Sequence, residues 1–285
     1  MRTTELIDML NRDMREEHAA VLRYLIHSYT EGEDTPVGAK LLTRSREEMW
    51  HLHWLGHIVG QLGGEPDLSP AEYPHDATSR ATILQSYITY EEKLVPHYNA
   101  EAEKVDDPHI RRVLEREAWE SSFHASAFRR LLNKLDPEEA NGLPEAEASL
   151  PRDFLDSLQR EVADKYTEML EHIRHSWVLQ SGGVLGWRLM DQSMEKMRHL
   201  AHFAEDVAEN GMEPDLRSEE LSTAKDPAAA LRSSLKRLQQ ARERHLKLNE
   251  NPETAKHAGF ALNLDLTLKQ EQFQEGEISD WLREY

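Results

Sequence analysis

The stretch Glu47-Glu48-Met49-Trp50-His51, within residues 41–62, decides the fold of this chain. Around it, residues recur at steps of three and four positions, as on the inward face of a bundle helix: Leu41, Ser45, Glu48, Leu52, Leu55, Val59 and Leu62. Glu48 and His51 are three positions apart, so on a helix both side chains can reach one ion. Because a buried glutamate is costly unless it is paired or holds a metal, we predict a metal-binding helix here.

The helical period runs through every long segment, and no segment alternates convincingly between apolar and polar residues as a strand does. We therefore predict an all-α fold. Pro96 lies inside the third expected helix and should kink it. The expected helices cover residues 4–29, 37–62, 80–104, 107–135, 152–179, 185–210, 227–248 and 252–282.

The second half of the chain repeats features of the first half. The tetrapeptide Glu65-Pro66-Asp67-Leu68 recurs 148 positions later as Glu213-Pro214-Asp215-Leu216, beyond a linker at 136–151 that contains Pro and Gly. Several matches in one register indicate a duplication, so we predict two tandem four-helix bundles, at residues 1–140 and 141–285. The other matches are His27-Ser28 with His175-Ser176, Gly38 with Gly186, His51-Leu52 with His199-Leu200, and Gly63 with Gly211.

The composition restricts the possible partners. The 285 residues include 34 Lys and Arg against 53 Asp and Glu, and this formal charge of −19 argues against nucleic acid and against an anionic membrane. The chain has no Cys, so a metal must be held by carboxylates and imidazoles. No run approaches about 18 apolar residues and no signal-peptide pattern is visible, so we expect a cytoplasmic protein.

Acidic and imidazole side chains occur on the expected inward faces of the four N-terminal helices, as a two-metal site in a four-helix bundle requires. Such carboxylates repel one another and are unstable when buried without a cation. On the fourth helix, Glu120 lies four positions before His124 and Glu117 lies seven before it, and we favour Glu120. Tyr24 is expected beside the site, where it can donate a hydrogen bond or an electron. The candidate ligands are Glu17, Glu48, His51, Glu91, Glu120 and His124.

This constellation, together with Glu16-Glu17-His18-Ala19-Ala20, resembles the ferritin-like di-iron superfamily, most closely its bacterioferritin and rubrerythrin branch. The resemblance covers the first predicted bundle and, more faintly, the second. It implies two Fe or Mn ions, with Glu48 as a bridging carboxylate and one imidazole on each ion. The chain departs from the family at Ser121, where the helix-four glutamate usually stands, and in lacking the cysteines of a rubredoxin tail. Met49 falls near the family's haem-ligating methionine, but because Met197 matches it in the repeat, we expect no haem.

The second predicted bundle has lost the ligand pattern. At the offset of 148 positions, Glu17 corresponds to Lys165 and Glu48 to Lys196. Two cations in place of two carboxylates would repel metal ions, so we predict a degenerate bundle without a two-metal site. A weaker site remains open for the other acidic and imidazole side chains of this half, which are Glu161, Glu168, His172, Glu195, His199 and His202.

Two main hypotheses for function follow. In the first, the chain is a ferritin-like oxidoreductase whose two-metal site reacts with O2 or H2O2 in ferroxidase, peroxidase or oxidase chemistry, as the resemblance implies. In the second, the chain is a non-catalytic metal-binding or interaction module. The second bundle would then act as a built-in pseudo-dimer partner, and we expect a monomer or a homodimer. A third hypothesis, an oxygenase, needs an apolar cavity beside the site, with Tyr87, Trp119 and Phe123 as candidate walls.

Overall fold

The computed structural model describes residues 1–146, 148–179 and 183–285, and within these ranges the chain forms helices and no strand. The all-α prediction is therefore confirmed, and each expected helix is present. None of the helices in the described ranges is both long and apolar enough to cross a membrane. The elements are α1 (Thr3–Glu31), α2 (Pro36–Gln61), α3 (Arg80–Ala102), α4 (Pro108–Leu132), α5 (Pro137–Asn141), α6 (Arg152–Val178), α7 (Leu185–Glu209), α8 (Pro227–Asn249), η2 (Thr254–Lys256) and α9 (Ala258–Trp281).

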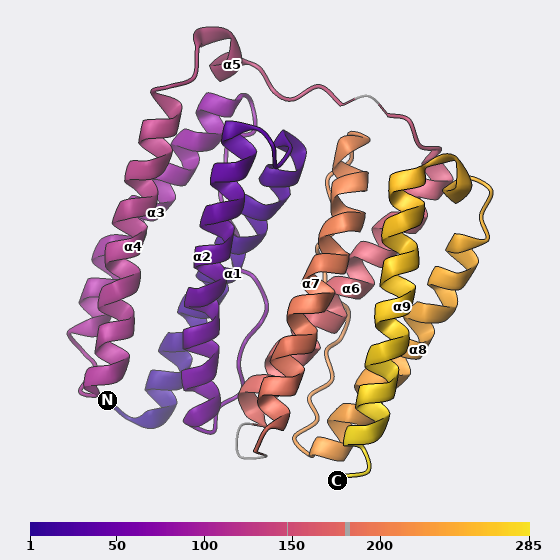
Figure 1. The fold of residues 1–285 in the computed structure, drawn as a ribbon. Coiled ribbons are helices and arrows are strands. Elements are labelled where there is room, and N and C mark those ends of the chain that lie inside the picture. The colour runs from indigo at the N-terminus through magenta and orange to yellow at the C-terminus, as the bar shows by residue number, and fades with distance from the viewer. Residues whose placement is uncertain (147, 180–182) are drawn as a thin grey trace. The chain divides into compact units, whose positions relative to one another are not determined.

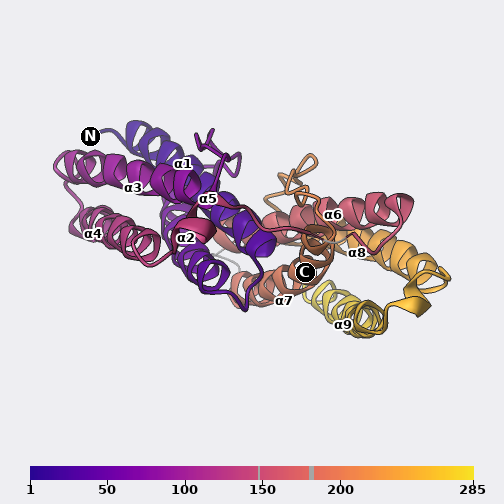
Figure 2. The same cartoon turned by 90° about the horizontal axis from the view of Figure 1, so that it is seen from above.

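The chain divides into two compact units, Met1–Glu145 and Ala146–Tyr285. In the first unit α1 packs on α2 and α3 packs on α4, and in the second α6 packs on α7 and α8 on α9. Figures 1 and 2 show the long helices of each unit running alongside one another. Short connections join α1 to α2 and α3 to α4, whereas residues 62–79 and 210–226 form long connections between the pairs. One long crossover per bundle is the connectivity of ferritin-like four-helix bundles.

Two short helices were not predicted. The helix α5 lies inside the expected linker at 136–151, which also contains residue 147, outside the described residues. The single turn η2 precedes α9, so that α9 begins at Ala258 and not at 252 as predicted. The hydroxyl of Thr254 donates to the carbonyl oxygen of Leu248 at 2.6 Å, which holds this segment in a turn between α8 and α9.

Local sequence sets the helix boundaries. Thr35 accepts a hydrogen bond from the N–H of Gly38 at 3.0 Å, with Pro36 at the first helical position of α2. Gly32 has a φ of 83° just after α1, a conformation that favours glycine. A Cβ on Gly38 would lie 2.0 Å from the carbonyl oxygen of Gly32, so only glycine permits this close passage of α2 past the end of α1. The helix α3 continues through Pro96.

The recurring tetrapeptide has the same structural role in both units. Asn11 on α1 donates to the carbonyl oxygen of Glu65 at 3.0 Å and accepts from the N–H of Asp67 at 3.0 Å. Gln159 on α6, 148 positions after Asn11, makes the matching pair of contacts with Glu213 and Asp215, both at 2.7 Å. One amide side chain thus fastens the long connection to the first helix of each unit. This correspondence supports the interpretation of the two halves as a duplication.

Candidate dinuclear metal centre

The core of the first unit contains two sets of potential metal ligands that share one residue. Glu17, Glu48 and His51 offer ligand atoms that lie within 4.8 Å of one another, and Glu48, Glu91 and His124 do the same. All five side chains are at most 2% exposed. Three carboxylates and two imidazoles from α1, α2, α3 and α4 therefore meet away from water, as the helical period predicted.

Glu48 lies between the two sets and presents one oxygen to each. Its Oε2 is 2.8 Å from Nδ1 of His51, and its Oε1 is 2.6 Å from Nδ1 of His124. Oε2 of Glu17 lies 3.0 Å from the same nitrogen of His51, and Oε1 of Glu91 lies 3.5 Å from that of His124. The two imidazole rings are nearly parallel, 6.0 Å apart. A carboxylate in this position can bridge two ions.

Each imidazole is oriented by a carboxylate on its outer side. Nε2 of His51 lies 2.6 Å from Oε2 of Glu120, and Nε2 of His124 lies 2.7 Å from Oε2 of Glu47. An ionised carboxylate only accepts hydrogen bonds, so each Nε2 donates, and in a neutral ring the Nδ1 lone pair then faces the inner carboxylates. This arrangement, in which an outer carboxylate orients an imidazole toward a metal, is typical of metal-binding histidines.

Burial and mutual repulsion perturb the inner carboxylates. Burial, with the neighbouring charge of Glu48, raises the pKa of Glu17 to about 7. Burial also raises the pKa of Glu117 well above its ordinary value, and the charge of Glu17 adds to this rise. Although burial alone would lower it, the carboxylates of Glu17 and Glu48 raise the pKa of His51 well above its ordinary value. The pocket therefore favours added positive charge, which either protons or metal ions can supply.

The structure separates the two candidates on α4. Glu120 faces outward, where it accepts from His51 and, at 2.9 Å, from Arg116. Burial alone would raise the pKa of Glu120, but the two hydrogen bonds lower it to about 2. Glu117 is fully buried, and neither of its oxygens has a hydrogen-bond partner among the described residues. Two orphaned carboxylate oxygens beside an acidic cluster are what a cation site requires, so the residues present fit a pair of divalent ions.

Two tyrosines support the inner carboxylates. The hydroxyl of Tyr24 donates to Oε1 of Glu91 at 2.5 Å, so Tyr24 lies beside the site. The hydroxyl of Tyr98 donates to Glu17 in the same way. The helical period turns Tyr98 inward, but sequence reasoning did not assign it to the site, although it follows Glu91 by seven positions, the spacing that separates Tyr24 from Glu17. That shared spacing was the available signal.

The proposed aromatic walls of an oxygenase cavity do not enclose the site. Trp119 is 64% exposed and Phe123 is 42% exposed, and the two rings stack on each other at 6.0 Å. Tyr87 is buried and packs edge-on against Tyr24 with 4.8 Å between ring centroids. These positions give no support to the oxygenase hypothesis.

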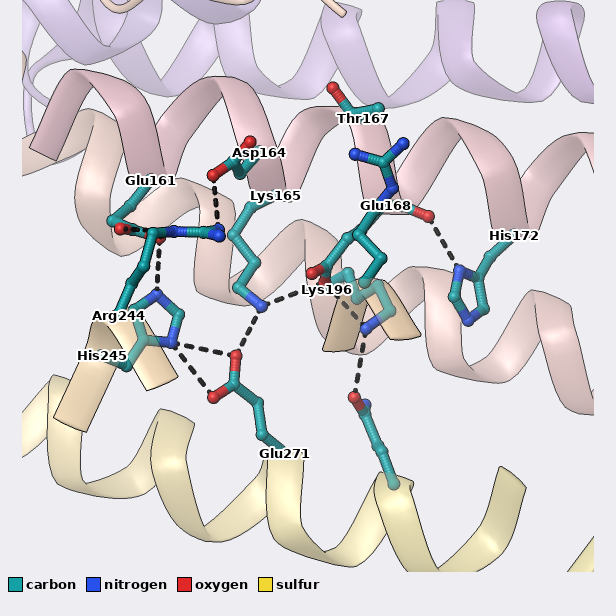
Figure 3. Close-up of polar contacts among 12 residues, drawn as sticks. Glu161, Asp164, Lys165, Thr167, Glu168, His172, Lys196, Arg244, His245 and Glu271 are labelled. Carbon is teal, nitrogen blue, oxygen red and sulfur yellow. Dashed lines mark hydrogen bonds and ion pairs between the residues drawn. The ribbon is translucent and has the colours of Figure 1, made fainter. Parts of the chain in front are cut away.

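The second unit fills the equivalent part of its core with fixed cations (Figure 3). Lys165 donates to Glu168 at 3.0 Å and to Glu271 at 2.5 Å, and Lys196 donates to Glu168 at 3.0 Å and to Gln274 at 3.4 Å. All five of these side chains are at most 1% exposed. The two ammonium groups neutralise the two carboxylates, so the cluster has no remaining charge for a metal to compensate.

Two buried histidines of the second unit, His172 and His199, lie close to its ammonium groups. Burial, and then the charge of Lys196, lowers the pKa of His172 to about 3, and its Nδ1 donates to the carbonyl oxygen of Glu168 at 2.8 Å (Figure 3). Burial with the charges of Lys165 and Lys196 lowers the pKa of His199 to about 3. The groups of acidic and imidazole side chains able to hold a metal, among the described residues, all lie in the first unit.

Comparison with known proteins agrees with this geometry. The model of the Ferritin family, which describes the ferritin-like domain, matches residues 7–137. Neither the curated proteins nor the solved structures yielded a match. The matched residues span the four long helices that carry the buried ligand sets. The N-terminal unit of this chain therefore belongs to the ferritin-like superfamily, and its core holds buried carboxylate and histidine groups compatible with a di-iron site.

Proposed function

We propose that the first unit binds two Fe ions, or two Mn ions, and reacts with O2 or H2O2 as a ferroxidase, peroxidase or oxidase. The observation that carries this proposal is the pair of buried ligand sets that share Glu48. When bound, the two ions would supply electrons and open coordination positions to the oxidant. The mixed oxygen and nitrogen donors suit Fe and Mn.

Geometry and charge balance support the following ligand assignment. Glu17, Glu48 and His51 hold one ion, and Glu48, Glu91 and His124 hold the other. Glu117, and not Glu120, supplies the remaining inner carboxylate, because Glu120 is already neutralised by Arg116 and hydrogen-bonded to His51. The four inner carboxylates of Glu17, Glu48, Glu91 and Glu117 then balance the charge of two divalent ions.

Tyr24 holds Glu91 in position and connects the centre to the protein surface. Its hydroxyl is 3.0 Å from the hydroxyl of Tyr73, and the ring of Tyr73 stacks on that of Tyr90 at 4.0 Å. The hydroxyl of Tyr90 donates to the half-buried Glu16. We propose that this row of tyrosines is the route by which an electron or a proton reaches the site.

The proposal is tested by metal content and by reactivity. The metal-free chain is loaded anaerobically with Fe(II), the bound iron is counted, and near-ultraviolet absorption is followed after O2 or H2O2 is added. We expect rapid growth of a ferric absorption band. Stable binding without any reaction would contradict the oxidoreductase proposal and leave the non-catalytic metal-binding module.

A matched pair of variants locates the reacting unit. Glu48→Ala removes a ligand of both ions, so we expect loss of two-metal occupancy while the helices remain folded. Lys196→Ala changes the corresponding position of the second unit, where a carboxylate-bound ammonium group lies, and we expect the metal content to stay the same. Equal loss of metal from both variants would mean that the wrong unit has been assigned.

A further inference from the structure

A third group of ligands lies near the dinuclear centre and is not used by it. Nε2 of His97 on α3 is 2.9 Å from Oδ1 of Asp13 on α1 and 3.6 Å from Oε2 of Glu101. One ligand atom from each of these residues lies within 4.8 Å of the others. One imidazole and two carboxylates at this spacing are a common donor set for a first-row divalent cation.

The two carboxylates of this group are buried and incompletely paired. Asp13 is 0% exposed and Glu101 is 5% exposed. Oδ2 of Asp13 and Oε2 of Glu101 accept no hydrogen bond from an N–H or O–H group in the described part of the chain, and the two carboxyl groups are close enough to share a proton with each other. Arg12 stands 4.0 Å from the other oxygen of Glu101, beyond hydrogen-bonding distance, and is itself 63% exposed. Burial first, and neighbouring carboxylates second, favour an added positive charge here.

The second unit shows which charge this position accommodates. At the offset of 148 positions, Glu161 takes the place of Asp13. The helices α3 and α8 align at their first residues, 147 positions apart, which puts Arg244 at the position of His97. Arg244 donates to Glu161 at 3.1 Å and also forms an ion pair with Asp164 (Figure 3).

The guanidinium and the imidazole occupy comparable surroundings. The side chain of Arg244 is 37% exposed and that of His97 is 39% exposed. In the second unit the guanidinium of Arg244 pairs with the buried carboxylate of Glu161. In the first unit the corresponding place holds three potential ligands of a cation. One helical turn further along, the second unit again has a fixed cation, because Lys165 stands at the position of Glu17.

We propose that Asp13, His97 and Glu101 form a third, mononuclear site for a divalent cation such as Fe(II) or Mn(II). His97 is partly exposed to solvent. Asp13 lies one turn of α1 from Glu17, so the proposed site lies between the solvent and the dinuclear centre. Both Asp13 and Glu17 act electrostatically on Glu117, which places Glu117 near both sites. The site is therefore positioned to load the dinuclear centre, and this role, unlike the binding itself, rests on the proposed function.

The test uses Mn2+, added anaerobically to the metal-free full chain, with the bound ions counted after removal of excess metal. We expect three ions in the native chain and two in His97→Arg, because the guanidinium takes the place of the ion as Arg244 does in the second unit. Electron paramagnetic resonance should show an isolated Mn2+ ion beside a spin-coupled pair, and only the isolated signal should disappear in His97→Arg. His109→Arg, the same change at an exposed position of α4, should retain all three ions.

The outcomes separate the two proposals. If Glu48→Ala retains one ion and the isolated signal, the third site binds independently of the centre. If the native chain holds a spin-coupled pair alone, and His97→Arg binds as much Mn2+ as the native chain, the result contradicts the third site and supports the dinuclear centre. If the native chain holds one ion that His97→Arg removes and Glu48→Ala does not, the third site stands and the proposed function is wrong.

Discussion

Glu48 and Lys196 occupy matching positions in the two units and give their buried cores charges of opposite sign. Both are at most 2% exposed, so neither charge is stabilised by water. Lys196 finds its counter-charge in Glu168 at 3.0 Å, within its own unit. Burial opposes the ionisation of Glu48, but the charges of His124 and His51 lower its pKa, against the repulsion of Glu91. In our proposal, divalent ions held by the same side chains supply this positive charge.

The two glutamates of α4 give a prediction at the scale of single residues. Glu117→Gln removes an inner negative charge without changing the shape of the side chain, so we expect one ion of the pair to be lost at Mn2+ concentrations that fill the native centre. Glu120→Gln still accepts from Nε2 of His51, so both ions should be retained with about 10-fold weaker binding, the lower end of the effect of outer partners of metal ligands. Titration with Mn2+ compares the two variants, and the opposite ranking would restore Glu120 as the ligand.

At the scale of helices, periodicity predicted most of the fold and much of the centre. Glu17, Glu48 and Glu91 recur in step with apolar residues on their helices, so their inward direction could be read from spacing alone. The matched glycines Gly63 and Gly211 were also informative, because both have a φ of 76° at the end of a helix. Patterns local to one helix were therefore sufficient for these features.

Features that depend on how helices pack against one another could not be predicted in this way. Glu117 and Glu120 are three positions apart on α4 and both lie near its inward face, so the rotation of α4 against α2 decides which is enclosed. Tyr73 comes from the long connection, where no period exists, and reaches Tyr24 only because residues 62–79 fold back over the bundle. Asp13 and His97 are 84 positions apart, and only the approach of α1 to α3 joins them.

The ion pairs between α6 and α9 predict how the second unit responds to acid. Burial alone would raise the pKa of Glu271, but Lys165 and His245 lower it from its ordinary value of 4.5 to about 2. A lowered carboxyl pKa contributes stability that is present above the unfolded pKa and is lost as pH falls through the folded one. The second unit should therefore lose stability between about pH 4.5 and 2, by on the order of 3 kcal/mol from Glu271.

Hydrogen exchange of peptides from α6 and α9 measures this loss separately from the first unit. Glu271→Gln is the control, because it leaves the helix unchanged and removes the titrating group. We expect a shallower fall in protection with pH in this variant than in the native chain. Identical pH dependence in the two proteins would show that the Glu271 ion pairs do not control the acid response.

At the scale of the whole molecule, the two units share one helical arrangement but balance the charge of their buried carboxylates in different ways. The first unit collects buried carboxylates around two imidazoles, and it repeats the arrangement on a smaller scale at Asp13. The second unit has a fixed cation near both of these places, from lysines in one and an arginine in the other. We interpret the second unit as a bundle whose stability does not depend on metal.

This difference predicts how the intact chain responds to metal removal. An ion that binds only the folded state adds about 2.7 kcal/mol of stability at a concentration 100 times its dissociation constant. Removing metal with a chelator should therefore sharply reduce hydrogen-exchange protection in α1 to α4, while protection in α6 to α9 stays within error, because the ammonium and guanidinium groups cannot be extracted. Adding Mn2+ back should restore the first unit alone. An equal loss of protection in both units would contradict the assignment of metal to the first, and unchanged protection in both would contradict metal binding altogether.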